Sequence, residues 1–474
     1  MSNMSGKGKG FGNSARYQST GSRDPIWTRV SGDPGNQGLG DSSRTSASAE
    51  KIQLQCSTAS HGKGLNVTSA AVFIAGEMAG SGVLALPRAV VEAGWIGLVL
   101  LIVFCLNAAY GGSRLGACWA IIEERYPEYR DRVRNPYATI GYRAVGRWGS
   151  ILVSACIQFT LFGAGTVYLQ LSSTIFQDLM NDVLPQVGIC VWFIFIALLL
   201  VVPMWLGSPK DFWVVGIGAL LTTAFACVFI FSQMVIDGLH NTEPVPVKNH
   251  GFGSFFLSFG TILFAFGGAS TFPTIQNDMA EKQHFSKSIL IGFATIMALY
   301  LPVAAGGYFI YGEAVDPNVI LSLGHSSLVS MANVLMAIHL ILAFLIVINP
   351  VCQELEEIFQ VPHEFCLKRC ILRTIMMCIM VFVGETIPKF GKILSLVGGS
   401  TITLLTFVFP SLFYMILCDQ KGEEWPQRHI PLYKRVYMWE LIIIGLVGGS
   451  ASTYNAILDI FSAESMAKPC YWPL

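Results

Sequence analysis

The chain has 474 residues, of which 53% are hydrophobic and 13% are charged. Soluble globular domains carry about 25% charged residues, so this composition excludes an ordinary soluble domain and indicates a protein embedded in a lipid bilayer. Lysine and arginine together number 30, as do aspartate and glutamate. A chain without a basic excess is not expected to bind nucleic acid.

Residues 1–64 differ in composition from the rest of the chain. They are rich in glycine, serine, lysine and arginine and contain no apolar run that could form a core, which is typical of a disordered segment. The first apolar stretch begins near Leu65, too far from the N-terminus for a signal peptide. The sequence therefore predicts a disordered cytosolic tail over 1–64, a transmembrane domain over 65–462 and a short extracytosolic C-terminus over 463–474.

Apolar segments recur along the predicted domain. A helix that crosses a bilayer needs about 20 mostly apolar residues, and the segments of that length predict an all-α membrane protein with about eleven transmembrane helices. The predicted spans are 67–92, 95–119, 149–177, 187–206, 212–236, 254–277, 287–311, 329–350, 371–388, 391–418 and 437–461. With a cytosolic N-terminus, most lysine and arginine residues of this domain fall in cytosolic loops, as the positive-inside rule requires.

Glycine, serine and proline interrupt the first and sixth predicted spans. Irregular backbone at membrane depth is tolerated where it is buried in protein or lines a cavity. Such breaks expose amide groups that attract a carboxylate and carbonyl groups that attract an ammonium group, so an amino acid zwitterion fits both. The alternative is that the small residues only allow close helix packing. The predicted substrate-binding residues at the breaks are Ala79, Gly80, Ser81, Gly82, Phe266, Gly267, Gly268, Ala269 and Ser270.

The two breaks are five spans apart, which indicates an inverted repeat. A block of spans one to five enters the membrane from the cytosol, and a block of spans six to ten enters from outside. Each block has a long connection between its second and third spans, over 135–148 and 316–330. The pattern predicts a 5+5 repeat with broken helices one and six, followed by one extra helix.

Two ionisable residues lie near mid-depth in the predicted spans. Glu77 is ten residues past Val67, and His339 is ten residues past Val329, which places each about 15 Å into the bilayer core. A carboxyl group there is costly to ionise, so Glu77 is a candidate for proton coupling or for contact with the substrate amine, and His339 is a candidate proton relay. Either residue could instead be neutral and bonded to a backbone group.

The third predicted span carries a polar and an aromatic residue on one face. Gln158 and Phe162 are four residues apart and share a face of the predicted helix. They are therefore candidate substrate contacts, and core packing is the alternative.

Motifs for metal binding and catalysis are missing from the sequence. The twelve cysteines are scattered and form no CxxC pair, and His363, Cys366 and Cys370 match no standard zinc spacing. No HExxH, GxSxG or GxxxxGK[ST] motif occurs. We therefore predict no metal site, no cofactor, no catalytic residues and no enzymatic activity.

At the broken spans the sequence resembles the amino acid/auxin permease family, which shares the leucine-transporter fold. The matching stretches are Gly80–Pro87 with Gly94-Trp95, Phe259–Phe266, and Gly398–Thr401 with Phe409-Pro410. The resemblance covers roughly residues 62–462. It implies cation-coupled movement of amino acids, with the substrate held between spans one and six and lined by spans three and eight.

Three features bear on how far the resemblance extends. Residues 237–252 contain no cysteine, so an outer-loop disulfide of some relatives cannot form there. Glu77 stands where several relatives are expected to carry a neutral residue. A sodium ion would need hard oxygen ligands, and residues 337–348 of span eight contain no hydroxyl group. This favours a proton over sodium as the coupling ion, although backbone carbonyls could still hold sodium.

These observations predict a secondary active transporter that moves amino acids, neutral ones by preference, through a lipid bilayer by alternating access. We expect it to be a symporter that is coupled to protons. The alternatives are an amino acid sensor or receptor on a transporter scaffold and a sodium-coupled transporter. We expect a multi-pass protein of the plasma membrane, rather than of a lysosomal or vesicular membrane, with a cytosolic N-terminus.

Overall fold

The computed structural model describes residues 64–130, 133–206, 212–240, 250–362, 364–422 and 425–462, without the side chains of 212–215. The predicted tail, apart from Gly64, and the predicted C-terminal segment lie outside these residues. In the described part of the chain the one β-type pairing is an isolated bridge between Leu65 and Met279. The protein is all-α, as predicted.

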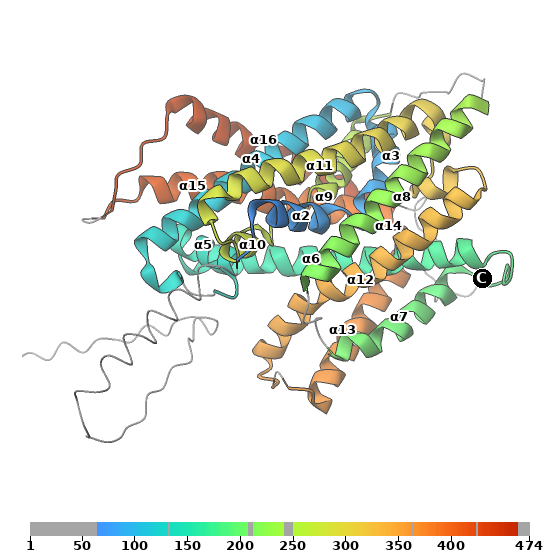
Figure 1. Ribbon diagram of the computed structural model, residues 1–474, viewed down its shortest axis with the longest axis horizontal. Helices are drawn as coiled ribbons and strands as arrows, with labels where there is room; N and C mark the ends of the chain where they lie inside the picture. The colour runs from blue at the N-terminus through green and yellow to red at the C-terminus, as the bar shows by residue number, and fades with distance from the viewer. Residues whose placement is uncertain are drawn as a thin grey trace, which may run out of the picture. The chain divides into compact units, whose positions relative to one another are not determined.

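Each predicted span falls on one helix or on helices in tandem (Figure 1). The helices are α2 (Val67–Met78) with α3 (Gly82–Ala93), α4 (Ile96–Arg125), α6 (Arg147–Met180), α7 (Ile189–Leu206), α8 (Phe212–His240), α9 (Phe252–Ala265) with α10 (Phe272–Asn277), α11 (Phe285–Gly306), α12 (Ser327–Ile358), α13 (Leu367–Thr386), α14 (Phe390–Val397) with α15 (Phe409–Asp419), and α16 (Leu432–Phe461). Within the described residues, eight helices are long and apolar enough to cross a membrane alone, and α2 with α3, bent by 61°, makes a ninth span. The remaining two spans are the interrupted pair α9–α10 and α13, whose first turns carry basic residues.

Local sequence explains several helix boundaries. The Asn66 side chain accepts a hydrogen bond of 2.7 Å from the Ser69 amide at the start of α2, and Ser326 caps α12 in the same way. Gly94, with φ of +69°, ends α3 in a backbone conformation that side chains disfavour. These caps place the helix ends close to where the apolar pattern predicts them.

The broken first span lies among long helices. The half-helix α2 packs against α8 and α11, whereas α3 packs against α9 and α11 (Figure 1). The helices α6 and α12 pack against each other, and α12 also packs against α8. Large apolar side chains such as Val191, Phe195 and Leu198 of α7 are more than half exposed, which suits a surface covered by lipid.

Two parts of the fold contain elements that the apolar pattern does not predict. The connection over 135–148 contains a helix, α5 (Pro136–Val145). The tenth span is not one regular helix, because two π-helical stretches, Gly398–Ile402 and Leu404–Val408, separate α14 from α15. A Cβ atom at Gly398 would lie 1.9 Å from the Gly260 carbonyl oxygen of α9. The glycine motif therefore lets this irregular stretch approach α9 closely.

Candidate substrate site

A cavity lies where the two broken spans meet α6 and α12. Residues from α2, α3, α6, α9, α12 and the break after α9 line it, together with Ile402 of the first π-helical stretch. The lining residues are Glu77, Met78, Ser81, Gly82, Thr160, Leu161, Ala164, Tyr168, Phe264, Gly267, Ser270, Val347 and Ile402. Segments far apart in the sequence thus converge on the breaks in the first and sixth predicted spans.

The break after α2 frees backbone carbonyl groups, and side chains from neighbouring helices bind them. Ala79 leaves the helical conformation with ψ of 99°. The Tyr300 hydroxyl of α11 donates a 2.6 Å hydrogen bond to the Met78 carbonyl oxygen, and the Thr223 hydroxyl of α8 lies 3.5 Å from the Ala79 carbonyl oxygen. Tyr300 and Thr223 therefore hold the break in place.

The start of α3 faces the cavity. Ser81 and Gly82 line the cavity, and α3 begins at Gly82. The Val83 and Leu84 amide groups donate to the Gly80 and Ser81 carbonyl oxygens at 3.2 Å. The Ser81 and Gly82 amide groups and the positive end of the helix dipole are what this end of α3 offers to the cavity. This end of α3 can therefore receive a carboxylate group.

Gly80 brings two polar side chains close to the break. A Cβ atom at Gly80 would lie 3.1 Å from His339 Nε2 and 3.4 Å from the Tyr168 hydroxyl oxygen. His339 Nδ1 lies 3.2 Å from the Ala219 carbonyl oxygen and 3.1 Å from the Thr223 hydroxyl oxygen. In the neutral tautomer whose Nδ1 donates to the Ala219 carbonyl group, Nε2 carries no proton. The Nε2 atom of that ring then faces Gly80 as an acceptor.

The second break contributes Gly267 and Ser270 to the cavity. Phe266 is fully buried and its ring lies 6.3 Å from the Phe293 ring and 6.0 Å from the Tyr300 ring, centroid to centroid. A Cβ atom at Gly268 would lie 2.8 Å from the Met78 side chain. Phe266 thus packs against α11, and Gly268 lies where the second break crosses α2. Ala269 is also buried, and a role of these three residues in binding stays a prediction.

The third span presents a different face from the one predicted by spacing alone. Thr160, Ala164 and Tyr168 line the cavity at intervals of four residues. Gln158 and Phe162 are each two residues from Thr160, about 200° around the helix, and so point away from this face. Neither Gln158 nor Phe162 lines the cavity, and their contact with substrate stays a prediction. Thr160, Leu161, Ala164 and Tyr168 of this helix line the cavity and were not predicted from the sequence.

Glu77 lies in the last turn of α2 and is the one charged residue in the described cavity lining. The other lining side chains are apolar or carry uncharged polar groups. Among the described residues no group of three His, Cys, Asp or Glu side chains could hold a metal ion. The site therefore offers one carboxyl group, the amide groups of α3 and an apolar wall.

Comparison with known proteins identifies the family. A family model described as transmembrane amino acid transporter protein matches residues 63–458. The chain belongs to this family. The resemblance to amino acid permeases predicted from the sequence is therefore confirmed, and a transmembrane amino acid transporter is a multi-pass membrane protein and not an enzyme.

Two curated relatives of this transmembrane amino acid transporter come from Arabidopsis thaliana. Amino acid transporter AVT1J is 25% identical over 400 residues, which cover 81% of this chain and 89% of the relative. Amino acid transporter AVT3B is 24% identical over 423 residues, which cover 83% of this chain and 93% of the relative. The similarity thus extends over most of both chains.

Solved structures show the same fold. A manganese transporter of Eremococcus coleocola superposes with a TM-score of 0.56 at 13% identity and covers 84% of this chain and 87% of its own. Mhp1, a nucleobase-cation-symport-1 family transporter in a closed conformation, has a TM-score of 0.52 at 13% identity and covers 85% of this chain and 96% of its own. At this identity the likeness concerns the fold alone, and it confirms the predicted leucine-transporter type of architecture.

Tyr300→Phe should weaken amino acid transport moderately. The change removes the hydrogen bond to the Met78 carbonyl group and leaves the ring packing intact. The loss of one such bond costs about 1 kcal/mol, so we expect KM to rise about threefold to tenfold. Initial uptake rates at varied substrate concentration measure this change. Tyr454→Phe, at a tyrosine that is 64% exposed on α16, is the control and should leave KM unchanged.

Proposed function

We propose that the chain is a secondary active transporter that moves neutral amino acids together with protons by alternating access. The observation that supports this most is the pairing of the α3 amide groups with the Glu77 carboxyl group in one cavity. The first can receive the carboxylate of an α-amino acid, and the second can receive its ammonium group.

The rest of the cavity favours an uncharged substrate side chain. Leu161, Phe264 and Val347 form an apolar wall. A charged substrate side chain would lose its hydration against this wall without an opposite charge to compensate for it. Neutral amino acids are therefore the proposed class.

Glu77 is the proposed proton-coupling group, with His339 as the second candidate. Glu77 lines the cavity, so a proton bound there directly changes how the substrate ammonium group is held. His339 adjoins Gly80 and can accept a proton at Nε2. Sodium remains the alternative, and the absence of hydroxyl groups between Ala337 and Ile348 argues against it.

We propose that the protein lies in the plasma membrane and that its N-terminus is in the cytosol. The positive-inside pattern supports this orientation. Cys190, next to the start of α7, is disulfide-bonded, and disulfides persist in oxidising compartments. Three of the proposed membrane crossings separate the N-terminus from this cysteine, so a disulfide on the outer side supports a cytosolic N-terminus. Fluorescence microscopy of the tagged protein in its native cell tests the choice of membrane.

Uptake into proteoliposomes tests the proposed transport. Labelled amino acids are presented with and without sodium and with and without an inward proton gradient. We expect accumulation of neutral amino acids that follows the proton gradient and does not require sodium. Binding without uptake would instead identify a sensor. Accumulation that requires sodium would identify sodium, and not the proton, as the coupling ion.

Deletion of residues 1–62 should leave transport unchanged, because the cavity is built from residues 77–402. The truncated and full-length proteins are compared in proteoliposomes at equal protein content. Truncated protein that inserts in normal amount and moves no substrate would give the tail a direct part in transport.

A further inference from the structure

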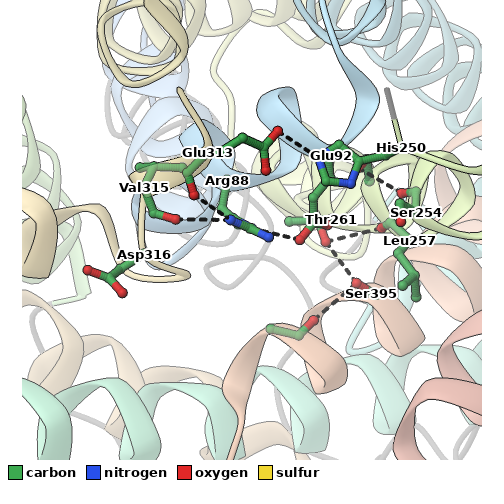
Figure 2. Close-up of polar contacts among 12 residues, drawn as sticks. Arg88, Glu92, His250, Ser254, Leu257, Thr261, Glu313, Val315, Asp316 and Ser395 are labelled. Carbon is green, nitrogen blue, oxygen red and sulfur yellow. Dashed lines mark hydrogen bonds and ion pairs between the residues drawn. The ribbon is translucent and has the colours of Figure 1, made fainter. Parts of the chain in front are cut away.

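A polar cluster joins the far end of α3 to a segment that follows α11 (Figure 2). The Arg88 guanidinium group pairs with Glu92 of the same helix at 2.8 Å. It also donates hydrogen bonds of 3.3 Å to the Glu313 carbonyl oxygen and 3.2 Å to the Val315 carbonyl oxygen. The last turns of α3 are therefore attached to residues 313–315.

The same segment is attached to α9 by a hydrogen bond between side chains, which is also an ion pair when His250 is protonated. Glu313 Oε1 lies 2.8 Å from Nε2 of His250, which precedes the first turn of α9 (Figure 2). The two side chains are 15% and 20% exposed, so the contact is partly shielded from water, where such a contact is stronger than on an open surface. One short segment thus connects the outer halves of both broken spans.

Both ends of this segment are fixed to α8. Asp237 of α8 accepts a 2.5 Å hydrogen bond from the Tyr311 hydroxyl and a 2.9 Å hydrogen bond from the Gly324 amide. The stretch 311–324 is therefore held at its ends by one helix, while its interior holds α3 and α9. In addition, Thr261 of α9 shares a 2.8 Å hydrogen bond with Ser395 of α14.

We propose that Arg88, His250 and Glu313 form an outer latch, which holds α3 and α9 together through residues 311–324 and must open whenever the cavity exchanges substrate with the outer solution. This inference rests on the proposed function. None of the three residues lines the cavity, so they are positioning residues. Breaking the latch favours the outward-open state without altering the contacts that hold the substrate.

The test compares KM on the two sides of oriented proteoliposomes. Glu313→Ala should lower KM for substrate on the outer side about threefold to tenfold and raise KM on the inner side by a similar factor, because the change shifts a conformational equilibrium and leaves the site intact. His250→Ala should act in the same direction. His325→Ala, at an exposed histidine of the neighbouring loop, is the control.

A double variant with exchanged charges distinguishes the loss of an ionic contact from general damage to the fold. His250→Glu places two carboxyl groups together and should shift both KM values as Glu313→Ala does. Adding Glu313→Lys restores opposite charges and should return both KM values toward those of the unaltered protein. KM values that rise on both sides, that stay unchanged, or that the double variant does not restore would overturn the latch.

Amide hydrogen exchange tests the latch independently of transport. In the lipid-embedded protein, residues 251–258 and 312–322 should exchange faster in Glu313→Ala than in His325→Ala. Equal exchange would overturn the latch. Faster exchange in a protein that accumulates no amino acid would instead support the latch and overturn the proposed function.

Discussion

Gly80→Val should reduce amino acid binding by about tenfold to a hundredfold, since overpacking a tight site costs about 1–3 kcal/mol. The first added atom would lie 3.1 Å from His339 Nε2 and 3.4 Å from the Tyr168 hydroxyl oxygen. The two branched methyl groups of valine would extend further into the same space. Either His339 and Tyr168 move away from the break, or α3 is displaced from the position in which its amide groups face the cavity.

Equilibrium binding of a labelled amino acid to the purified protein measures this effect without requiring turnover. The matched control is Gly218→Val on α8, because a Cβ atom there meets no atom within 4 Å. The control should bind normally. Unchanged affinity of Gly80→Val would place the substrate away from this break.

Gly268→Val provides a second comparison within the same region. Its added atom would meet the Met78 side chain at 2.8 Å and the Phe272 ring at 3.2 Å. Met78 of α2 lines the cavity, whereas Phe272 of α10 does not. A reduced affinity in this variant would therefore report on the crossing of α2 with the second break, together with the cavity wall that Met78 forms.

The spans and the two breaks could be predicted because the signals for them are local. Runs of about 20 apolar residues determine where a helix can cross a bilayer, and residues such as Asn66 and Gly94 end or begin helices through contacts within a few positions. Ser81, Gly82, Gly267 and Glu77 could be found for the same reason, since each lies at or beside an interruption that is visible in the sequence.

The side chains that stabilise the breaks could not be found in this way. Tyr300 and Thr223 lie in regular apolar helices, and they matter because the fold places them beside the Met78 and Ala79 carbonyl groups. Tyr168 faces the cavity because of the rotation of α6, which the sequence does not specify, since the polar residues of that helix are spread around it and mark no single face. Such roles depend on which helices become neighbours.

Irregular elements were missed for a related reason. The π-helical stretches after α14 arise where Gly398 approaches the backbone of α9, and the apolar pattern of that span is compatible with a regular helix. The disulfide at Cys190 likewise depends on a partner that spacing does not reveal.

Glu77→Gln should abolish accumulation driven by a proton gradient while retaining exchange of substrate across the membrane. Glutamine has nearly the shape of glutamate and keeps a carbonyl oxygen that can accept from the substrate ammonium group, but it cannot bind and release a proton. The substitution therefore separates proton handling from packing. Glu440→Gln, at an exposed residue of α16, is the control and should accumulate substrate normally.

The physical basis is the location of Glu77 in the cavity. A carboxyl group at membrane depth is costly to ionise unless a positive charge compensates for it, so its protonation and the binding of a substrate ammonium group influence each other. A proton gradient drives accumulation only if proton binding favours one orientation of the transporter over the other. Exchange requires the conformational change in both directions but no net release of protons.

Both activities are measured in the same proteoliposomes. Net uptake is driven by an imposed pH gradient, and exchange is followed as loss of preloaded label when unlabelled substrate is added outside. The expected result for Glu77→Gln is no accumulation above equilibrium, with exchange at a substantial fraction of the unaltered rate. Loss of both activities would show that the carboxyl group also binds substrate in a way that an amide cannot replace. Full gradient-driven uptake would exclude Glu77 as the coupling group, and His339, whose Nε2 faces the same break, would become the residue to replace next.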